Sequence, residues 1–212
     1  MAESISKSVL KRLPVYLNYL KALPEDTPDH ISATTIASAL NMGGVQVRKD
    51  LAMVSDSGRP KVGYPRCSLT TDIEQFLGYD NTNNAVLIGA GKLGRALLGY
   101  TGFSEYGLNI VAAFDADPAQ AETDPSGRPV LPMEELAGLC ARRNILIGII
   151  TVPAPHAQEV CDRLIANGIK AIWNFAPAHL DVPEGILVHN ENMAASLAIL
   201  SKHLSAQMKR FE

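Results

Sequence analysis

The sequence predicts an α/β protein in which helices precede a doubly wound parallel sheet and a long helix ends the chain. A glycine-rich turn at 89–94 joins a short apolar run to a helix-prone segment, as in the first turn of a nucleotide-binding sheet. Strand-like and helix-like segments then alternate as far as residue 188. Before residue 80, by contrast, the apolar residues recur at the spacing of helices.

The composition suits a chain that buries a sizeable core: 47% of its 212 residues are hydrophobic, and its formal net charge is −3. Residues 1–75 hold nine Lys or Arg and eight Asp or Glu, whereas the remainder holds ten and fourteen. The less acidic N-terminal third is therefore the part suited to an anionic partner. Three cysteines without a CxxC pair, no signal peptide and no apolar run long enough to span a bilayer predict a reduced, cytoplasmic protein without membrane contact.

The first segments predict a helix-turn-helix unit. Apolar residues in 9–23 fall at helical spacing, and Pro14 among them predicts that this helix begins near the proline or is kinked there. Ser32 is a suitable N-cap for a second helix, which ends before a turn at 41–43. A third helix then begins near Gly44, so two short helices flank a glycine-containing turn.

The third helix carries two kinds of residue. Its buried side is predicted to hold Val45, Val47, Leu51 and Val54, and the residues between them are Gln46, Arg48, Lys49 and Asp50. Gln and Arg can read adenine and guanine edges with two hydrogen bonds each, and Lys suits a phosphate. Gln46, Arg48 and Lys49 are therefore candidate DNA-binding residues, although a short charged run is also typical of a solvated helix face.

The stretch 56–64 follows this helix with Gly and Pro punctuation and contains two cations, Arg59 and Lys61. A basic hairpin after a recognition helix is what a winged-helix module places against DNA, and a plain surface hairpin is the alternative. We include Arg59, Lys61 and Tyr64 among the DNA-binding candidates. An extended segment is expected to continue to Leu69, followed by a short connecting helix at 71–77.

The organising motif is Gly89-Ala90-Gly91-Lys92-Leu93-Gly94, which follows the apolar run 85–88. Gly89 permits the tight turn from strand to helix, Gly91 lets a pyrophosphate approach the backbone, and Gly94 lets helix and strand pack closely. The helix N-terminus adds free N–H groups and a positive dipole end. We therefore expect the motif to bind a cofactor through Gly89, Ala90, Gly91, Lys92, Leu93 and Gly94.

A second apolar run, 110–114, ends in Asp115 about twenty residues after the motif. A carboxylate at this strand end accepts hydrogen bonds from an adenosine ribose and repels a 2′-phosphate, which predicts NAD(H) rather than NADP(H). Alternatively, Asp115 serves the turn formed by Ala116-Asp117-Pro118.

Further strands are predicted at 129–131, 145–152, 171–175 and 186–188, with helices at 133–143 and 155–167. Together they predict a Rossmann-like doubly wound parallel sheet, which binds ligands at the carboxyl ends of its strands. This rule nominates residues for the nicotinamide side of the crevice: Thr151, Val152, Pro153, Asn174 and Phe175. The alternative for all of them is ordinary loop structure.

A long helix is predicted from Asn190 to Phe211, with apolar residues repeating every three or four positions: Met193, Leu197, Leu200, Leu204, Met208 and Phe211. Such a stripe packs either on the chain's own core or on a partner subunit. We accordingly divide the chain into a winged-helix DNA-binding domain at 1–80, a Rossmann-like NAD(H)-binding domain at 81–189 and a C-terminal dimerisation helix at 190–212.

The chain shows no recognisable catalytic apparatus. One doubly wound domain uses most residues after Asn84, the five histidines are scattered, and no pattern of His, Cys and carboxylate predicts a metal. These features favour a DNA-binding module joined to a dinucleotide sensor, with no enzyme activity. Two alternatives stay open: a small NAD-dependent oxidoreductase, and a CoA- or nucleotide-binding protein whose N-terminal helices form a dimer arm.

Segments with a recognisable pattern are spread over nearly the whole chain: Lys11-Arg12-Leu13-Pro14, Gln46-Val47-Arg48-Lys49-Asp50-Leu51, Val62-Gly63-Tyr64, the glycine motif, Phe114-Asp115, Val152-Pro153-Ala154, Gly168-Ile169-Lys170 and Asn174-Phe175-Ala176-Pro177. In these segments, taken in this order, the sequence resembles the Rex family of redox-sensing transcriptional repressors. The resemblance implies a homodimer with a C-terminal helix swapped between subunits, which binds palindromic operator DNA. It implies that NADH releases the DNA, that NAD⁺ competes without releasing it, and that Tyr100 lies near the nicotinamide.

Four residues, at three places in the chain, depart from the family's pattern. Gly43-Gly44 stands where an N-capping Thr or Ser and a better helix former are usual. Pro60 occupies a position where a basic wing residue is common, between Arg59 and Lys61. Asn192 stands where many members carry an Asp that faces the partner's nicotinamide pocket.

Overall fold

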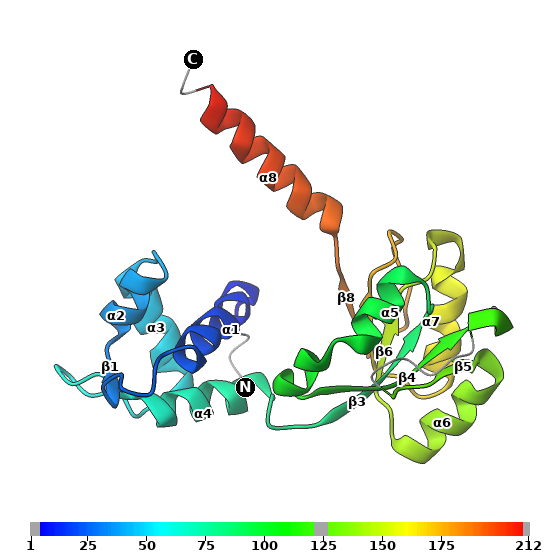
Figure 1. Cartoon of the computed structure of the whole chain (residues 1–212), viewed down its shortest axis with the longest axis horizontal. Coiled ribbons are helices and arrows are strands. Elements are labelled where there is room, and N and C mark those ends of the chain that lie inside the picture. Colours follow the sequence, from blue (N-terminus) through cyan, green and yellow to red (C-terminus); the bar gives the residue numbers. More distant parts are fainter. Residues whose placement is uncertain (1–4, 121–126, 210–212) are drawn as a thin grey trace. The chain divides into compact units, whose positions relative to one another are not determined.

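The computed structural model describes residues 5–120 and 127–209 of the chain. Contacts between residues divide it into two compact units, Met1–Asn81 and Thr82–Glu212 (Figure 1). The first unit is mainly helical, and the second is built on a six-stranded sheet.

The first unit contains the helices α1 (Lys7–Lys21), α2 (Ala33–Ala39), α3 (Gly44–Val54) and α4 (Arg66–Leu77). Two short antiparallel strands, β1 (His30–Ile31) and β2 (Tyr64–Pro65), pair beside them. α1 packs on α4 and α2 packs on α3 around one apolar core. Ser32 caps α2 as predicted, because its side chain accepts a hydrogen bond from the Thr35 N–H at 3.0 Å. The fold is the winged helix-turn-helix that the sequence predicted.

The structure decides one helix start and corrects another. α1 begins at Lys7, with Ser6 as its N-cap, and runs through Pro14, which excludes a start near the proline and leaves a kinked helix as the other prediction. α4 begins at Arg66, so the extended segment to Leu69 and the later helix start are wrong. The Arg66 N–H at this start donates to the Asp29 carbonyl oxygen at 2.7 Å. That long-range bond satisfies a donor of the first helical turn, and no local sequence pattern announces it.

The side-chain pattern of α3 requires two corrections. Val47 and Leu51 are fully buried as predicted, but Val45 is 67% exposed. Asp50, predicted on the polar face, is only 3% exposed. The buried stripe therefore includes Asp50 at its margin, where the helix faces α1. Gly43 stands at the N-cap without a side-chain hydrogen bond, as its missing side chain requires.

The second unit has a six-stranded parallel sheet in the order β5-β4-β3-β6-β7-β8. Its strands are β3 (Asn83–Ile88), β4 (Leu108–Asp115), β5 (Val130–Pro132), β6 (Ile147–Ile150), β7 (Ala171–Asn174) and β8 (Leu187–Asn190). The α-helices between them are α5 (Lys92–Gly99), α6 (Leu136–Arg143) and α7 (Ala157–Ala166). Short 3-10 helices are η1 (Thr101–Tyr106), η2 (Pro118–Gln120), η3 (Met133–Glu135) and η4 (Ala154–His156). This is the strand order of a doubly wound dinucleotide fold, which confirms the predicted class.

Both faces of the sheet are apolar, and alternate residues of β3 divide between them. Val86 and Ile88 join a core that includes residues of α6 and α7. Ala85 and Leu87 join a second core that includes Leu98 of α5. All four are buried, as expected for a strand covered on both sides.

The last helix, α8 (Met193–Met208), buries none of its side chains. Asn190, the predicted start, is instead the last residue of β8, and Asn192 caps the helix by accepting a hydrogen bond from the Ala195 N–H at 2.9 Å. The apolar residues of its stripe are 56–65% exposed: Met193, Leu197, Leu200, Leu204 and Met208. Phe211 lies outside the described residues. Packing of this stripe on the chain's own core is therefore not observed along 193–208.

None of the helices in the described ranges combines the length and the hydropathy that crossing a membrane requires.

Candidate functional site

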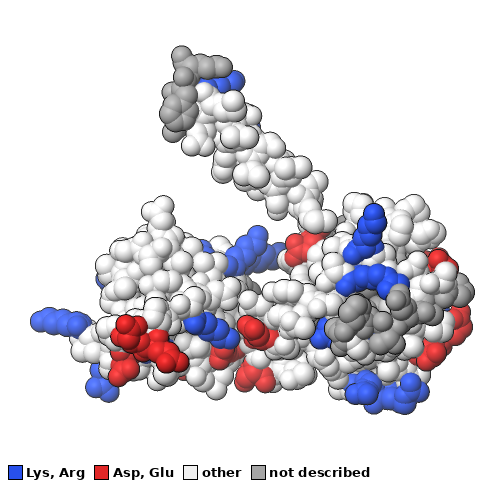
Figure 2. Space-filling model, viewed as in Figure 1, with Lys and Arg blue, Asp and Glu red and all other residues white. Residues whose placement is uncertain are grey.

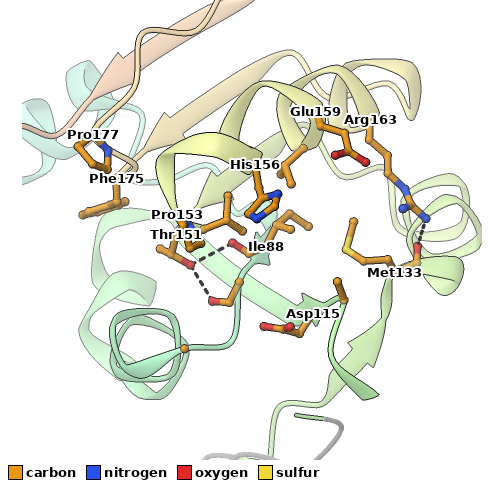
Figure 3. A pocket seen from close by; sticks show the side chains of 15 residues that line it. Ile88, Asp115, Met133, Thr151, Pro153, His156, Glu159, Arg163, Phe175 and Pro177 are labelled. Atoms are coloured by element: carbon orange, nitrogen blue, oxygen red, sulfur yellow. Dashed lines mark hydrogen bonds between the residues drawn. The ribbon is translucent and has the colours of Figure 1, made fainter. Parts of the chain in front are cut away.

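A crevice lies at the carboxyl edge of the sheet, where the strand order reverses between β3 and β6. The loops that begin at Gly89 and Thr151 meet there (Figure 3). Its volume is about 600 Å³, which suits an organic ligand. Its lining consists of Ile88, Gly89, Gly91, Asp115, Ala116, Met133, Thr151, Val152, Pro153, His156, Glu159, Val160, Arg163, Phe175 and Pro177.

Two of the three glycines of the motif, Gly89 and Gly94, occupy positions where a larger residue would be strained, and the third, Gly91, borders the crevice. Gly89 has a φ of +104°, in the region that favours glycine. A Cβ on Gly94 would collide with the Gly89 carbonyl oxygen, so helix and turn pack backbone to backbone. A Cβ on Gly91 would meet nothing within 4 Å, because this residue opens onto the crevice. The space beside Gly91, at the N-terminus of α5, fits a pyrophosphate.

Asp115 lies at the end of β4 and lines the same crevice. Its carboxylate accepts a hydrogen bond from the Ala90 N–H at 2.6 Å and another from the Asp117 N–H at 2.9 Å. The residue therefore supports the following turn, as one interpretation predicted, and also borders the cavity, as the other required. A half-buried carboxylate beside the glycine turn is suited to a ribose hydroxyl.

Thr151, Val152 and Pro153 line the crevice on the β6 side, as predicted. The Thr151 hydroxyl lies within hydrogen-bond distance of the Gly89 carbonyl oxygen (2.7 Å) and of the Ile88 carbonyl oxygen (3.0 Å). These contacts join the two loops at the reversal point (Figure 3).

A further side of the crevice was missed by the sequence analysis. Four of its residues come from η4 and α7: His156, Glu159, Val160 and Arg163. Arg163 also donates to the Met133 carbonyl oxygen at 2.8 Å (Figure 3). The signal available in the sequence was the spacing of three to four residues between these side chains in the helical segment that follows β6. Residues at this spacing share one face of a helix, and here that face borders the carboxyl edge of the sheet.

Asn174 does not line the crevice. It is fully buried, and its amide nitrogen donates to the carbonyl oxygens of Ala176 and Ala178 and to Asn190 Oδ1 at 2.9–3.2 Å. Its oxygen accepts a hydrogen bond from the Ala176 N–H at 3.0 Å. The side chain thus fixes the loop that carries Phe175 and Pro177, the residues that do line the cavity.

Five other candidates of the motif region also lie outside the lining: Ala90, Lys92, Leu93, Gly94 and Tyr100. Tyr100 is 51% exposed and makes an edge contact with Phe103, with ring centroids 4.9 Å apart. Phe103 in turn contacts Trp173, and Trp173 contacts Phe175. Tyr100 is therefore connected to the crevice through a row of aromatic rings.

In the first unit, Gln46, Arg48 and Lys49 are all exposed on α3. The loop after α3 closes at Arg59, whose N–H donates to the Gly63 carbonyl oxygen at 2.9 Å, and this loop carries exposed Arg59 and Lys61. A hollow of about 540 Å³ lies beside the loop and is lined by Ser32, Ala33, Thr34, Arg48, Gly58, Arg59, Pro60, Lys61, Gly63 and Tyr64. Tyr64 is 8% exposed, so most of its ring belongs to the core of this unit.

A buried ionic network ties α3 to α1. Arg12 donates to both carboxylate oxygens of Asp50, at 2.7 and 2.8 Å, and the Tyr16 hydroxyl donates to the same carboxylate at 2.8 Å. Burial disfavours ionisation of Asp50, but the bonds from Arg12 and Tyr16 outweigh it and hold the pKa of Asp50 below its usual value. Burial, reinforced by the hydrogen bond to Asp50, raises the pKa of Tyr16 to about 12.

Within residues 5–120 and 127–209, no group of three or more His, Cys, Asp or Glu side chains has the arrangement of a metal site.

A winged helix-turn-helix joined to a dinucleotide-type sheet defines a class of two-domain proteins that combine a DNA-binding fold with a cofactor-binding fold. Residues 4–52 match the family model described as "Putative DNA-binding protein N-terminus", and residues 80–178 match the model described as "CoA binding domain". A redox-sensing transcriptional repressor of the Rex family, from Porphyromonas gingivalis, is 42% identical over 202 residues, covering 95% of this chain and 93% of its own. The chain therefore belongs to the Rex family of redox-sensing transcriptional repressors.

Another Rex repressor, from Treponema denticola, is 42% identical over 191 residues, covering 90% of this chain and 91% of its own. Solved structures agree. A Rex-family repressor determined with β-NAD⁺ and operator DNA has a TM-score of 0.88 and 34% identity, covering 97% of this chain and 94% of that one. The same repressor with β-NADH has a TM-score of 0.84 and 33% identity, covering 98% and 99%.

Proposed function

We propose that this chain is a transcriptional repressor that binds operator DNA as a homodimer and releases it when NADH binds. It thereby senses the ratio of NADH to NAD⁺. The observation that carries the proposal is the likeness, over 97% of the chain, to a repressor solved with β-NAD⁺ and operator DNA. A second structure of that repressor contains β-NADH.

The crevice supports NAD(H) as the cofactor. Gly91 leaves room for a pyrophosphate at the start of α5, and Asp115 borders the cavity with a carboxylate. A 2′-phosphate on the ribose would meet that negative charge, so NADH is favoured over NADPH. The same charge opposes the phosphorylated ribose of CoA, despite the description of the family model that residues 80–178 match.

The exposed cations of the first unit support DNA as the partner. Arg48 on α3 and the loop residues Arg59 and Lys61 line the same hollow. This arrangement suits a helix that reads base edges in a DNA groove and a wing that binds phosphates. We assign base contacts to Gln46 and Arg48, and backbone contacts to the wing and Lys49. The ring of Tyr64 packs directly against Gly58, so closely that a Cβ on Gly58 would collide with it. Tyr64 therefore supports the wing.

Two uncovered apolar surfaces in the second unit support a homodimer. The apolar stripe of α8 is exposed from Met193 to Met208, and Figure 2 shows that this helix is almost free of charged residues. A hollow of about 310 Å³ at the other end of the strands is lined by Leu108, Ile147, Ala171, Ile172, Trp173, Leu187, Val188 and His189. We infer that a swapped helix, within 190–212, covers such a surface of the partner subunit, with 1–80 and 81–189 as the DNA-binding and cofactor domains.

We infer further that the cofactor, and not either of the two buried cysteines, carries the redox signal, and that the protein is a cytoplasmic regulator without enzyme activity. Cys140 and Cys161 are buried, whereas Cys67 is exposed. Burial raises the pKa of the Cys140 thiol and raises that of Cys161 to about 11, so few thiolates form at neutral pH. The relatives named above are repressors.

The test is a titration of DNA binding with cofactor. A palindromic duplex, selected from a random pool with this protein, is fluorescently labelled, and its anisotropy is followed with NADH, NAD⁺ or neither. We expect NADH to weaken binding roughly 5- to 150-fold, the usual size of an allosteric coupling, and NAD⁺ to leave the complex intact. A protein that selects no duplex, or whose complex ignores NADH, contradicts the proposal.

Removal of α8 tests the dimer. The truncation is made after Asn192, because Asn190 bonds to Asn174 and must be kept. We expect a monomer by sedimentation velocity, with the fluorescence of the single tryptophan, Trp173, still reporting a folded sheet. A truncated chain that stays dimeric shows that another surface joins the subunits.

A further inference from the structure

The side chain of Gln46 is held by a neighbour that does not itself belong to the recognition helix. With its amide oxygen turned toward α1, Gln46 accepts a hydrogen bond from Arg12 Nη1 at 2.9 Å, and Arg12 Nε, whose single N–H donates to Asp50, lies 3.2 Å from the same oxygen. The opposite orientation would set the amide N–H groups against the guanidinium donors, so the oxygen takes this side. The amide nitrogen of Gln46 then points away from Arg12.

Arg12 is itself fixed in place. Its Nε and Nη2 atoms form a two-bond pair with Asp50, which sits one helical turn after Gln46 on α3. The Tyr16 hydroxyl donates to the same carboxylate. Because Asp50 is 3% exposed and Arg12 is anchored by this pair, the guanidinium has little freedom to leave Gln46.

Gln46 is the third residue of α3, in the part of a recognition helix whose side chains reach base edges. A free Gln reads adenine with two bonds, because its oxygen accepts from N6 and its nitrogen donates to N7. Gln46 has its oxygen engaged by Arg12, which leaves the N–H groups for DNA. With only its N–H groups available, Gln46 favours a base edge that presents hydrogen-bond acceptors.

We propose that Arg12 is a specificity-determining positioning residue, which turns Gln46 from an adenine reader into a hydrogen-bond donor. The inference rests on the proposed DNA-binding function. At the base that Gln46 faces, guanine offers two acceptors, N7 and O6, whereas cytosine offers a competing N4 donor. The protein therefore prefers guanine there, disfavours cytosine and gives adenine no two-bond advantage.

The experiment compares base preferences by selection from duplexes with a randomised half-site, followed by anisotropy on each single-base variant. Gln46→Ala identifies the position that Gln46 governs, as the one whose preference flattens. Arg12→Lys keeps a positive charge for Asp50 but lacks the planar fork that reaches Asp50 and Gln46 together. We expect this variant to shift the preference at that position from guanine toward adenine by roughly five- to tenfold, with the other positions unchanged.

Gln46→Glu gives a second test that leaves the buried network intact. One carboxylate oxygen still faces Arg12, and the other accepts where the amide donated, so cytosine becomes the preferred base. Lys21→Met is the matched control, because it removes a cation from the same helix that contacts Glu74 of α4 and not α3. Circular dichroism confirms the fold of each variant.

A wild-type preference for adenine at the Gln46 position overturns the inference, as does a folded Arg12→Lys protein with unchanged preference. The inference is also overturned if Gln46→Ala leaves the base preference at every position unchanged, or if Gln46→Glu does not acquire a preference for cytosine. These outcomes all require a protein that selects DNA. Failure to select any duplex instead refutes the proposed function on which the inference rests.

Discussion

Two aspartates, Asp50 in the helical unit and Asp115 in the sheet unit, are both close to the proposed functional surfaces but are held in opposite ways. Asp50 is 3% exposed and bonds to the side chains of Arg12 and Tyr16. Asp115 is partly exposed and bonds to two backbone N–H groups, those of Ala90 and Asp117. The first carboxylate is enclosed by protein, whereas the second borders a cavity.

The difference indicates which carboxylate serves the fold and which serves a ligand. A buried charge with side-chain partners from another helix cannot exchange them for a ligand without leaving other charges unpaired. A carboxylate at a strand end keeps free lone pairs toward the crevice. Stability should therefore depend on Asp50, and cofactor affinity should depend on Asp115.

The largest expected effect is on stability. Asp50→Ala should cost about 3 kcal/mol in the free energy of unfolding of the first unit, because Arg12 and Tyr16 lose their buried acceptor. Urea unfolding followed by far-ultraviolet circular dichroism measures this loss. The fluorescence transition of Trp173, which lies in the second unit, should stay in place.

Lys21→Ala serves as the control for this variant. Lys21 pairs with Glu74 at 2.7 Å, but both side chains are about one-third exposed, so water screens the pair. Its loss should cost at most about 1 kcal/mol. Equal costs for the two variants would remove the contrast between a buried network and a surface ion pair.

The second prediction concerns the cofactor. Asp115→Ala should weaken NADH binding by about 1.5–3 kcal/mol, the range for a hydrogen bond to a charged group. The same change should bring the affinities for NADH and NADPH closer together, because the negative charge that opposes a 2′-phosphate is gone. Calorimetric titration with both cofactors measures it, and equal affinities in the wild-type protein would refute the ribose assignment.

The third prediction distinguishes contacts to base edges from contacts to phosphates on the proposed DNA-binding surface. Arg48→Ala should cost about 1–3 kcal/mol on the selected operator and little on unrelated duplexes, as loss of a base contact does. Lys61→Ala should weaken binding to all duplexes and reduce the salt dependence, as loss of a phosphate contact does. Anisotropy at several salt concentrations tests both. An Arg48 variant that binds the operator as tightly as the wild type would exclude Arg48 from base reading.

The sequence was informative where one residue type answers one local demand. The glycine motif located the crevice, since Gly89 and Gly94 serve the turn and the packing that their spacing predicted. Ser32 was identified as a cap from its own position, and β3 and β4 from their apolar runs. These features depend on neighbours within a few residues.

Most of the differences between the predictions and the structure involve partners that lie far away in the sequence. Asp50 was assigned to the polar face because its partner Arg12, 38 residues earlier, left no sign in the local pattern. Asn174 was chosen for its place at a strand end, but Asn190 and the following loop take up its amide. α4 starts early because a backbone bond to Asp29 satisfies its first turn. The local spacing of apolar residues cannot show whether a polar side chain faces solvent or a partner that lies far away in the sequence.

The smallest expected effect is the dependence of the first unit's stability on pH, which again distinguishes Asp50. Because the pKa of Asp50 is lower in the folded state, its contribution is present above the unfolded pKa of about 3.9 and is lost as pH falls through the folded value. Tyr16 has the opposite sign: its raised pKa, about 12, stabilises the fold below pH about 10 and loses that effect as pH rises toward 12. Between about pH 5 and 8, neither group should change the urea midpoint.

Urea denaturation of the wild type, Asp50→Asn and Tyr16→Phe over a series of pH values tests this expectation. Asp50→Asn should remove the contribution that is lost at acid pH, and Tyr16→Phe should remove the one that is lost at alkaline pH. A wild-type midpoint that moves with pH in the neutral range through this network would show that Asp50 does not remain ionised there.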